Sequence, residues 1–379
     1  MKRAVFGLFL ALMAVGACTP AQTPPAAASA SAGPPQVTEN TRGEIVAVYE
    51  RRYDALRKRD LAGYQKTFDG TRLALRRCFT DAFDVAGRQG VPNVPDVGKV
   101  DVYGDYVRAY VNEGFGYRRL YFKRAEGGWI QSEPTDAELG GEKLKTFDGL
   151  QIAYWGIDED VIDVIAKSSL QARASVLRNL LSAESREPFG IRFYPTRSIA
   201  SVVNCAVVGT HLINTPSDPF VRMYRYWFNK EATDLSPDTI TFIQHEGLHW
   251  AQDQFIPAIN VRLPWFLAEG WPDYIGESRS LPTMRNVICN TPTPSFKQLS
   301  DGLIITPETP QELPGQYYSF ANTMVEYLYL QFGGKDAYAR LLTAYKDGVN
   351  AEVNFPKVLG VTPAQFYDGW IAFAKKKYC

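Results

Sequence analysis

The sequence HEGLH at residues 245–249 decides how the second half of this chain is interpreted. Residues four apart lie on one face of an α-helix, so the imidazoles of His245 and His249 can reach the same zinc ion. Glu246 would then lie beside the position that the metal leaves open. A catalytic zinc site needs a third protein ligand, and Glu269 follows His249 by twenty residues. The spacing of the two histidines therefore predicts a zinc site, for which Glu269 is the candidate third ligand.

Residues on either side of the motif predict that it lies inside a helix. Ser236 can cap this helix, Pro237 suits its first turn, and Asp238 suits the positive end of its dipole. The helix should end before Pro257, because a proline disfavours helical backbone in the residue before it. Upstream, we expect a helix near residues 158–181 and strands at residues 150–154, 190–194 and 206–213.

The alternative is that the two histidines are ordinary surface residues of a helix. The chain has only three histidines, so chance rarely produces this motif. Its neighbours include Phe242, Ile243, Leu248 and Trp250, and burying a glutamate and two imidazoles among them would be costly without a metal. The nitrogen and oxygen donors favour zinc as the metal.

Two histidines followed by a glutamate at this distance resemble the HExxH…E pattern of the gluzincins, the class of zinc metallopeptidases that includes thermolysin. Residues 150–379 resemble the peptidase MA-like family of bacterial envelope proteins. The similarity includes residues 265–270, residues 318–328 followed by QFGG, and residues 359–366 followed by Trp370. The resemblance implies a gluzincin-type catalytic domain in an α+β protein.

The resemblance also implies a role for each site residue. Glu246 would be the general base, which takes a proton from water and later delivers it to the leaving amine. Asp273 follows Glu269 by four residues and would hydrogen-bond a ligand histidine, here His245. Pro272 would kink a regular helix between the two acids, so a solvated Asp273 stays an alternative.

The donor to the developing oxyanion is where this chain departs from the thermolysin pattern. Thermolysin-like enzymes use a downstream histidine and a tyrosine, but no histidine follows His249 in this chain. Tyr318 is the candidate donor, and a packing tyrosine is the alternative. His211 is expected on the strand before the motif, where a structural role is favoured over one in the cleft. That strand is a candidate edge for binding an extended peptide.

The N-terminus has the features of a bacterial lipoprotein signal. Lys2 and Arg3 precede an apolar run at residues 4–15, which is too short to span a bilayer. VGAC at residues 15–18 resembles a lipobox, so residues 1–17 would be a signal peptide and Cys18 would carry lipid. An ordinary secretory signal is the alternative. Thr19 favours the outer membrane if the organism is Gram-negative, again by resemblance.

Two further segments precede the motif domain. Residues 18–40 are rich in Pro, Ala and Ser and predict a tether. Residues 41–135 begin with apolar residues at helical spacing and continue with alternating, strand-like patterns and a hairpin turn at AEGG. This order loosely resembles the cone-shaped α+β fold of nuclear-transport-factor-2-like domains. A ligand pocket and a simple packing or spacer role both remain open for it.

Cysteines and charge limit the remaining possibilities. Cys78, Cys205, Cys289 and Cys379 would face an oxidising compartment, so disulfides are expected, with three pairings open. Residues 281–311, which contain many Pro and Thr, predict a long loop. The formal net charge is zero and no basic stripe is present, so we expect no nucleic-acid partner.

The sequence therefore predicts an envelope-anchored, zinc-dependent endopeptidase that acts on proteins or peptides. The alternative is a non-catalytic lipoprotein that binds a partner through a peptidase-like domain. Retention of Glu246 favours the enzyme, because a binding module does not need a general base. A third possibility is hydrolysis of a non-protein amide, as in cell-wall peptides. Neither the substrate nor the oligomeric state follows from the sequence.

Overall fold

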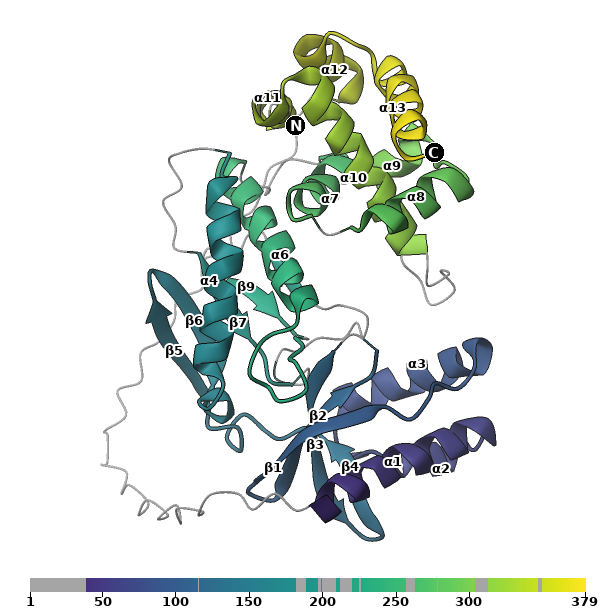
Figure 1. The fold of residues 1–379 in the computed structure, drawn as a ribbon, viewed down its shortest axis with the longest axis vertical. Helices are drawn as coiled ribbons and strands as arrows, with labels where there is room; N and C mark the ends of the chain where they lie inside the picture. Colours follow the sequence, from purple (N-terminus) through teal and green to yellow (C-terminus); the bar gives the residue numbers. More distant parts are fainter. Residues whose placement is uncertain are drawn as a thin grey trace, which may run out of the picture. The chain divides into compact units, whose positions relative to one another are not determined.

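The computed structural model describes residues 39–114, 116–181, 189–196, 199, 209–211, 220–224, 226–256, 263–277, 279–303, 313–346 and 350–379. The predicted signal peptide, Cys18, nearly all of the predicted tether and Cys205 lie outside these ranges. Helices and sheets are mixed along the chain, as the α+β prediction requires (Figure 1). Among the described residues, no helix combines the length and the apolar character needed to cross a membrane.

The first part of the described chain is three helices followed by an antiparallel sheet. The helices are α1 (Glu39–Arg57), α2 (Leu61–Gln65) and α3 (Leu73–Gln89), and the strands, in sheet order, are β1 (Asp96–Tyr103), β2 (Tyr106–Asn112), β3 (Tyr117–Ala125) and β4 (Gly128–Ser132). Ile45 and Tyr49 of α1 are fully buried in one core with Val107 and Phe122 of the sheet. The predicted helices and hairpin are confirmed, although α1 already includes the last two residues assigned to the tether. An acidic residue in the first turn favours this early start.

The second sheet has five described strands and carries the elements around the site. Their order is β5 (Glu142–Phe147), β6 (Leu150–Trp155), β7 (Gly190–Phe193), β9 (Phe220–Met223) and β8 (Gly209–His211). β6, β7 and β9 run parallel, while β5 and β8 pair antiparallel with their neighbours. The predicted strands at residues 150–154 and 190–194 are confirmed. Of residues 206–213, only 209–211 are described, and they form the edge strand β8; the side chain of His211 lies outside the description.

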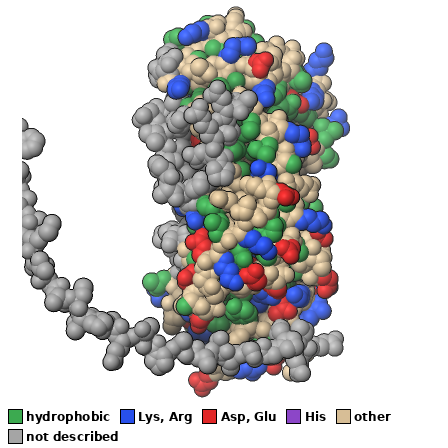
Figure 2. Space-filling model, turned by 90° about the vertical axis from the view of Figure 1, so that its left-hand side faces the viewer, with side chains coloured by type: hydrophobic (Ala, Val, Ile, Leu, Met, Phe, Trp, Pro, Cys, Tyr) green, Lys and Arg blue, Asp and Glu red, His purple; other side chains and the backbone are tan. Residues whose placement is uncertain are grey.

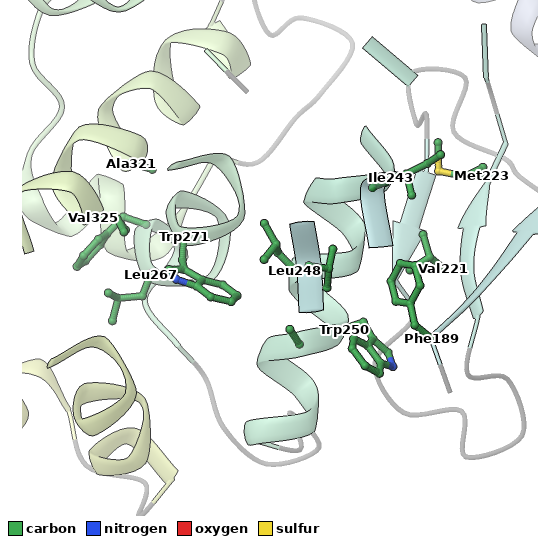
Figure 3. Close-up of a cluster of buried hydrophobic side chains, with 14 of the residues drawn as sticks. Phe189, Val221, Met223, Ile243, Leu248, Trp250, Leu267, Trp271, Ala321 and Val325 are labelled. Carbon is green, nitrogen blue, oxygen red and sulfur yellow. The ribbon is translucent and has the colours of Figure 1, made fainter. Parts of the chain in front are cut away.

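Two helices cover one face of this sheet. The short helix η1 (Gly156–Asp158) leads into α4 (Ile162–Arg178), and α6 (Pro237–Phe255) packs beside α4 (Figure 1). Ile243, Leu248 and Trp250 of α6 lie between side chains of the sheet region and side chains of α7 and α10 (Figure 3). The helix that carries the HEGLH sequence is therefore packed on both sides.

Helices make up most of the described residues from Trp265 to Tyr378. They are α7 (Trp265–Ile275), α8 (Leu281–Asn290), α9 (Phe296–Asp301), α10 (Leu313–Phe332), α11 (Gly334–Lys346), α12 (Ala351–Leu359) and α13 (Pro363–Tyr378). The predicted loop at 281–311 is wrong where α8 and α9 occur, and residues 304–311 lie outside the description. Ser280 and Ser295 cap these helices with their side chains, and Pro282 occupies a first turn, so the loop-like composition belongs to helix starts.

One disulfide that the sequence left open is defined. Cys289 of α8 is bonded to Cys379, which follows α13, with Cα atoms 5.6 Å apart. Cys78 is also disulfide-bonded. The first of these bonds fastens two helices that are already in contact.

Charged side chains are mixed rather than segregated on the surface seen in Figure 2, where Lys and Arg alternate with Asp and Glu. This distribution agrees with the formal net charge of zero. The described residues on this face therefore form no extended surface of one charge that a polyanionic partner could bind.

Buried charges join β3 to the segments that lead into α4 and α6. Arg119 of β3 forms an ion pair with Asp158 of η1, and their side chains are 3% and 0% exposed. Tyr226 donates a hydrogen bond to the same carboxylate at 3.0 Å. Nearby, Tyr117 and Phe228 exchange backbone hydrogen bonds of 3.0 and 2.7 Å. The first sheet is thereby tied to the chain just before the HEGLH helix.

Candidate metal centre

The helix α6 begins and ends where the sequence predicts. The hydroxyl of Ser236 accepts a hydrogen bond from the Thr239 backbone N–H at 3.3 Å, and Pro237 lies in the first turn. The helix ends at Phe255, before Pro257. His245 and His249 lie one turn apart with side chains 12% and 15% exposed, so both can be reached from one side of the helix.

The helix α7 brings Glu269 to these histidines. It continues through Pro272 to Ile275, so the proline does not end it and Asp273 stays one turn beyond Glu269. The side chain of Glu269 is 23% exposed, and its Oε2 atom lies 3.4 Å from His245 Nε2 and 3.3 Å from His249 Nε2. The three predicted ligands therefore meet at one place.

The triangle formed by the three ligand atoms has the dimensions of a tetrahedral zinc site. Its third side, between the Nε2 atoms of His245 and His249, is 3.2 Å. A four-coordinate zinc ion with bonds of about 2.0–2.1 Å separates its ligand atoms by about 3.3–3.4 Å. An octahedral magnesium ion with bonds of about 2.0–2.1 Å would bring adjacent ligands to about 2.8–3.0 Å. Both the spacing and the two imidazole donors therefore fit zinc.

The electrostatics of the three residues show how closely they are coupled. Burial by itself would raise the pKa of Glu269, but the two histidines outweigh it and hold that pKa well below its usual value. Burial would lower the pKa of His249, yet the carboxylate of Glu269 outweighs it and raises that pKa to about 9. Glu269 is therefore an anion in this site. The imidazole of His249 holds its proton more tightly than a free histidine does.

The structure also brings Tyr318 of α10 to the centre. Its hydroxyl donates a hydrogen bond of 3.0 Å to Oε2 of Glu269. Burial, followed by the Glu269 carboxylate, raises the pKa of Tyr318 well above its usual value, so the phenol stays protonated. Its ring has an edge-on contact with His245, with centroids 6.0 Å apart. Tyr318 is thus a hydrogen-bond donor held next to the ligand triangle.

Glu246 lies close enough to the centre to act on its groups electrostatically. After burial and Glu269, which have larger effects, its carboxylate also raises the pKa of Tyr318 and of His249. It likewise contributes to the raised pKa of Tyr224, which burial mainly causes. The side chain of Glu246 is partly exposed. The acid is therefore placed beside the triangle without being one of its corners.

Asp273 has partners other than the predicted one. The residue is 1% exposed, so the alternative of a solvated acid is wrong. Its carboxylate accepts hydrogen bonds from Arg279 Nε at 3.2 and 3.1 Å and from Asn322 at 3.0 Å. Among the described residues none of its hydrogen bonds reaches His245. The Arg279 guanidinium that Asp273 holds lies 5.3 Å from the centre of the Tyr318 ring.

Sequence reasoning missed Gln252, which contacts a ligand directly. Its side-chain Oε1 atom lies 3.1 Å from Nδ1 of His249. The three-residue spacing on one helix was a usable signal, because side chains three apart are neighbours on a helix surface. Its other contacts, with α7 and with Tyr338 of α11, depend on how distant helices pack.

Two glycines set how closely the site helices approach their supports. A Cβ atom on Gly247, which follows Glu246, would lie 2.8 Å from carbons of both Phe189 and Val176. A Cβ atom on Gly270, which follows Glu269, would lie 2.5 Å from the backbone oxygen of Ala321. Both distances are shorter than real Cβ contacts allow, so each position requires glycine at the present helix separation.

Two comparisons with known proteins found no match to this chain. No protein-family model matches it, and no curated protein matches its sequence. The description of the site as a metal centre therefore depends on the geometry and donor chemistry of His245, His249 and Glu269.

Proposed function

We propose that this chain is a zinc-dependent peptidase of the gluzincin type. The observation that carries the proposal is the triangle of His245, His249 and Glu269, whose sides of 3.2–3.4 Å suit a tetrahedral ion. Two functional groups lie next to it, the carboxylate of Glu246 and the hydroxyl of Tyr318. Metal ligands, base and donor together are the parts that amide hydrolysis needs.

The residues of the chain divide the chemistry between them. A zinc ion bound at this site would lower the pKa of a water molecule and polarise the scissile carbonyl. Glu246 would take the proton from the attacking water and deliver it to the leaving amine. Tyr318 would donate a hydrogen bond to the carbonyl oxygen as negative charge develops on it, because its raised pKa keeps the proton on the phenol.

The substrate and the location belong to the same proposal. Residues 150–379 would form the gluzincin-like domain and residues 41–135 a domain similar to the nuclear-transport-factor-2-like fold. The substrate would be a protein or peptide, reached from the surface of the bacterial envelope. Lipid on Cys18 would hold the protein there, at the outer membrane if the organism is Gram-negative. Labelling with a radioactive fatty acid, in wild type and in Cys18→Ser, tests the anchor.

The activity is tested with protein that begins at Thr19, compared with its Glu246→Gln variant. We expect about one zinc per chain in both proteins by elemental analysis, because Glu246 is not a ligand. We expect new peptide termini, detected by mass spectrometry in a mixture of denatured proteins, only with the wild type. Absence of zinc from the wild type would refute the site. Zinc without cleavage would favour the binding module, and cleavage by Glu246→Gln would refute the assigned base.

A further inference from the structure

Gln252 of α6 connects the two helices that carry the candidate ligands. Its side chain is buried, with 6% exposure of the residue, and its Oε1 atom faces His249 Nδ1 at 3.1 Å. Its Nε2 atom donates to the backbone oxygens of Ala268 at 3.1 Å and Leu267 at 3.3 Å, and to the Tyr338 hydroxyl at 2.5 Å. Ala268 is the residue before Glu269. One amide therefore spans the distance from a histidine ligand to the glutamate ligand.

The backbone contacts determine which way this amide points. A carbonyl oxygen can only accept a hydrogen bond, so the NH₂ end of Gln252 must face Leu267 and Ala268. The oxygen end then faces His249, and an oxygen acceptor requires that Nδ1 carry a proton. Zinc binds a neutral imidazole, and in a neutral imidazole with a proton on Nδ1 the lone pair is on Nε2. Nε2 is the atom that lies at a corner of the ligand triangle.

Pro272 explains why a side chain is needed at this place. In a regular helix the carbonyl of Ala268 would accept a hydrogen bond from the N–H four residues later, but proline has none. The α7 helix continues through Pro272 all the same, and the carbonyl of Ala268 receives its hydrogen bond from Gln252. The proline thus removes the helical donor four residues beyond Ala268, and Gln252 donates a hydrogen bond to that carbonyl.

We propose that Gln252 is a positioning residue that selects the tautomer of His249 and fixes His249 relative to Glu269. The inference rests on the proposed zinc site. Metal-bound histidines usually donate their second N–H to a partner that sets their orientation, and loss of such a partner costs about 10- to 100-fold in metal affinity. Here the partner is a neutral amide, so the orientation of His249 adds no further negative charge to the site.

Two substitutions in the full chain separate positioning from simple helix support. Gln252→Leu removes the acceptor for His249 and the donor for Ala268. Pro272→Ala supplies a backbone N–H to Ala268 and leaves His249 untouched. We expect Gln252→Leu to lower both the unfolding midpoint of the metal-free protein and the zinc affinity, the latter about 10- to 100-fold in a chelator competition. In the double variant Gln252→Leu/Pro272→Ala, the unfolding midpoint should match that of Pro272→Ala alone, because Pro272 is buried and its replacement has its own cost. The zinc affinity of the double variant should stay low.

Each other outcome overturns a defined part of the argument. If the double variant regains both stability and zinc affinity, Gln252 only supports α7 and positions nothing. If Gln252→Leu binds zinc as tightly as wild type, the inference fails while the zinc site stands. If wild type binds no zinc, the proposed function itself fails. Gln254→Leu, at a partly exposed position of the same helix, is the matched control and should bind zinc as wild type does.

Discussion

The hydroxyl of Tyr318 donates a hydrogen bond of 3.0 Å to the same carboxylate oxygen of Glu269 that faces both histidines. This contact joins α10 to α7 at the ligand triangle. Because a metal ion would compete for that oxygen, the phenol would be left with a free proton beside the open position. If the chain is the peptidase proposed above, this contact would place the donor where a developing oxyanion needs it.

Replacement of Tyr318 by Phe should lower kcat by about 10²- to 10³-fold, the usual cost of losing one oxyanion donor. Zinc content should not change, because the phenol is not a ligand. Steady-state kinetics on a peptide substrate and elemental analysis check these two expectations. Tyr317→Phe is the control, since Tyr317 is a buried neighbour that packs against Trp265. Equal kcat values in wild type and Tyr318→Phe would leave Tyr318 with a packing role only.

Arg119 and Asp158 should be strongly coupled in stability. Arg119→Met leaves a buried carboxylate with one hydrogen-bond donor, Tyr226, and should destabilise the protein by about 3–5 kcal/mol. Combining it with Asp158→Asn should cost less than the sum of the two single changes, because neither partner is then left as an unpaired charge. Denaturant titrations of the four proteins measure the coupling.

A neighbouring residue supplies the control for this cycle. Arg118→Met removes a more exposed ion pair with Glu113, in which the side chains are 22% and 36% exposed, and should cost about 1 kcal/mol or less. If the Arg119 and Asp158 changes were simply additive, the pair would not hold β3 to η1.

Asp69 should make stability depend on acid. Burial alone would raise its pKa, but hydrogen bonds from Lys123, Thr71 and Ser132 outweigh it and hold the pKa well below 3.8. A carboxyl whose pKa is lower in the folded state stabilises above the unfolded value, and this stabilisation is lost as the pH falls toward the folded pKa. Wild type should therefore exceed Asp69→Asn in free energy of unfolding at neutral pH, and the gap should narrow below about pH 3.8.

Urea denaturation between neutral pH and about pH 3 follows this narrowing. Asp54→Asn is the control, since Asp54 forms an exposed pair with Lys58 and should show almost no difference at any pH. A gap between wild type and Asp69→Asn that stayed constant with pH would contradict the low pKa of Asp69.

Asp273 should stabilise the packing of α7 on α10 rather than the metal. Asp273→Ala removes the acceptor of Arg279 and Asn322 and should cost about 2–3 kcal/mol. This is below the range of about 3–5 kcal/mol for fully buried pairs, because Arg279 is 23% exposed. Its zinc affinity should fall far less than that of His245→Ala. Denaturant and zinc titrations of Asp273→Ala and His245→Ala compare these effects. If Asp273→Ala lost as much zinc affinity as His245→Ala, Asp273 would have a role beside His245.

The ligand triangle could be predicted from the sequence because its parts are local. His245 and His249 share a helix whose start is marked by Ser236. Glu269 follows at the spacing that resembles the HExxH…E pattern of the gluzincins. The strand β6 could be predicted from the sequence in the same way, because its first residue and its last four residues are hydrophobic and buried. Local periodicity is sufficient information for such elements.

Other features depend on contacts that no local pattern encodes. The strand β5 is an edge strand in which five of six residues are exposed, so it has no buried face to reveal it, and the sheet begins at Glu142 rather than at residue 150. Gln252 matters only because α7, with its Pro272, packs against α6. Asp273 finds Arg279 and Asn322 instead of His245 because of the same packing. Position in space decides these roles.

Gly247 and Gly270 lead to an expectation about rigidity. Each glycine directly follows a glutamate of the site. Because glycine has no Cβ atom, the backbone of each helix lies in close contact with a neighbouring segment. The two helices cannot be pressed closer to their supports, and their other faces bear the site. We therefore expect metal entry to require only side-chain rotations, with little backbone reorganisation. Gly247 and Gly270 would then limit how far the backbone around the metal centre can move.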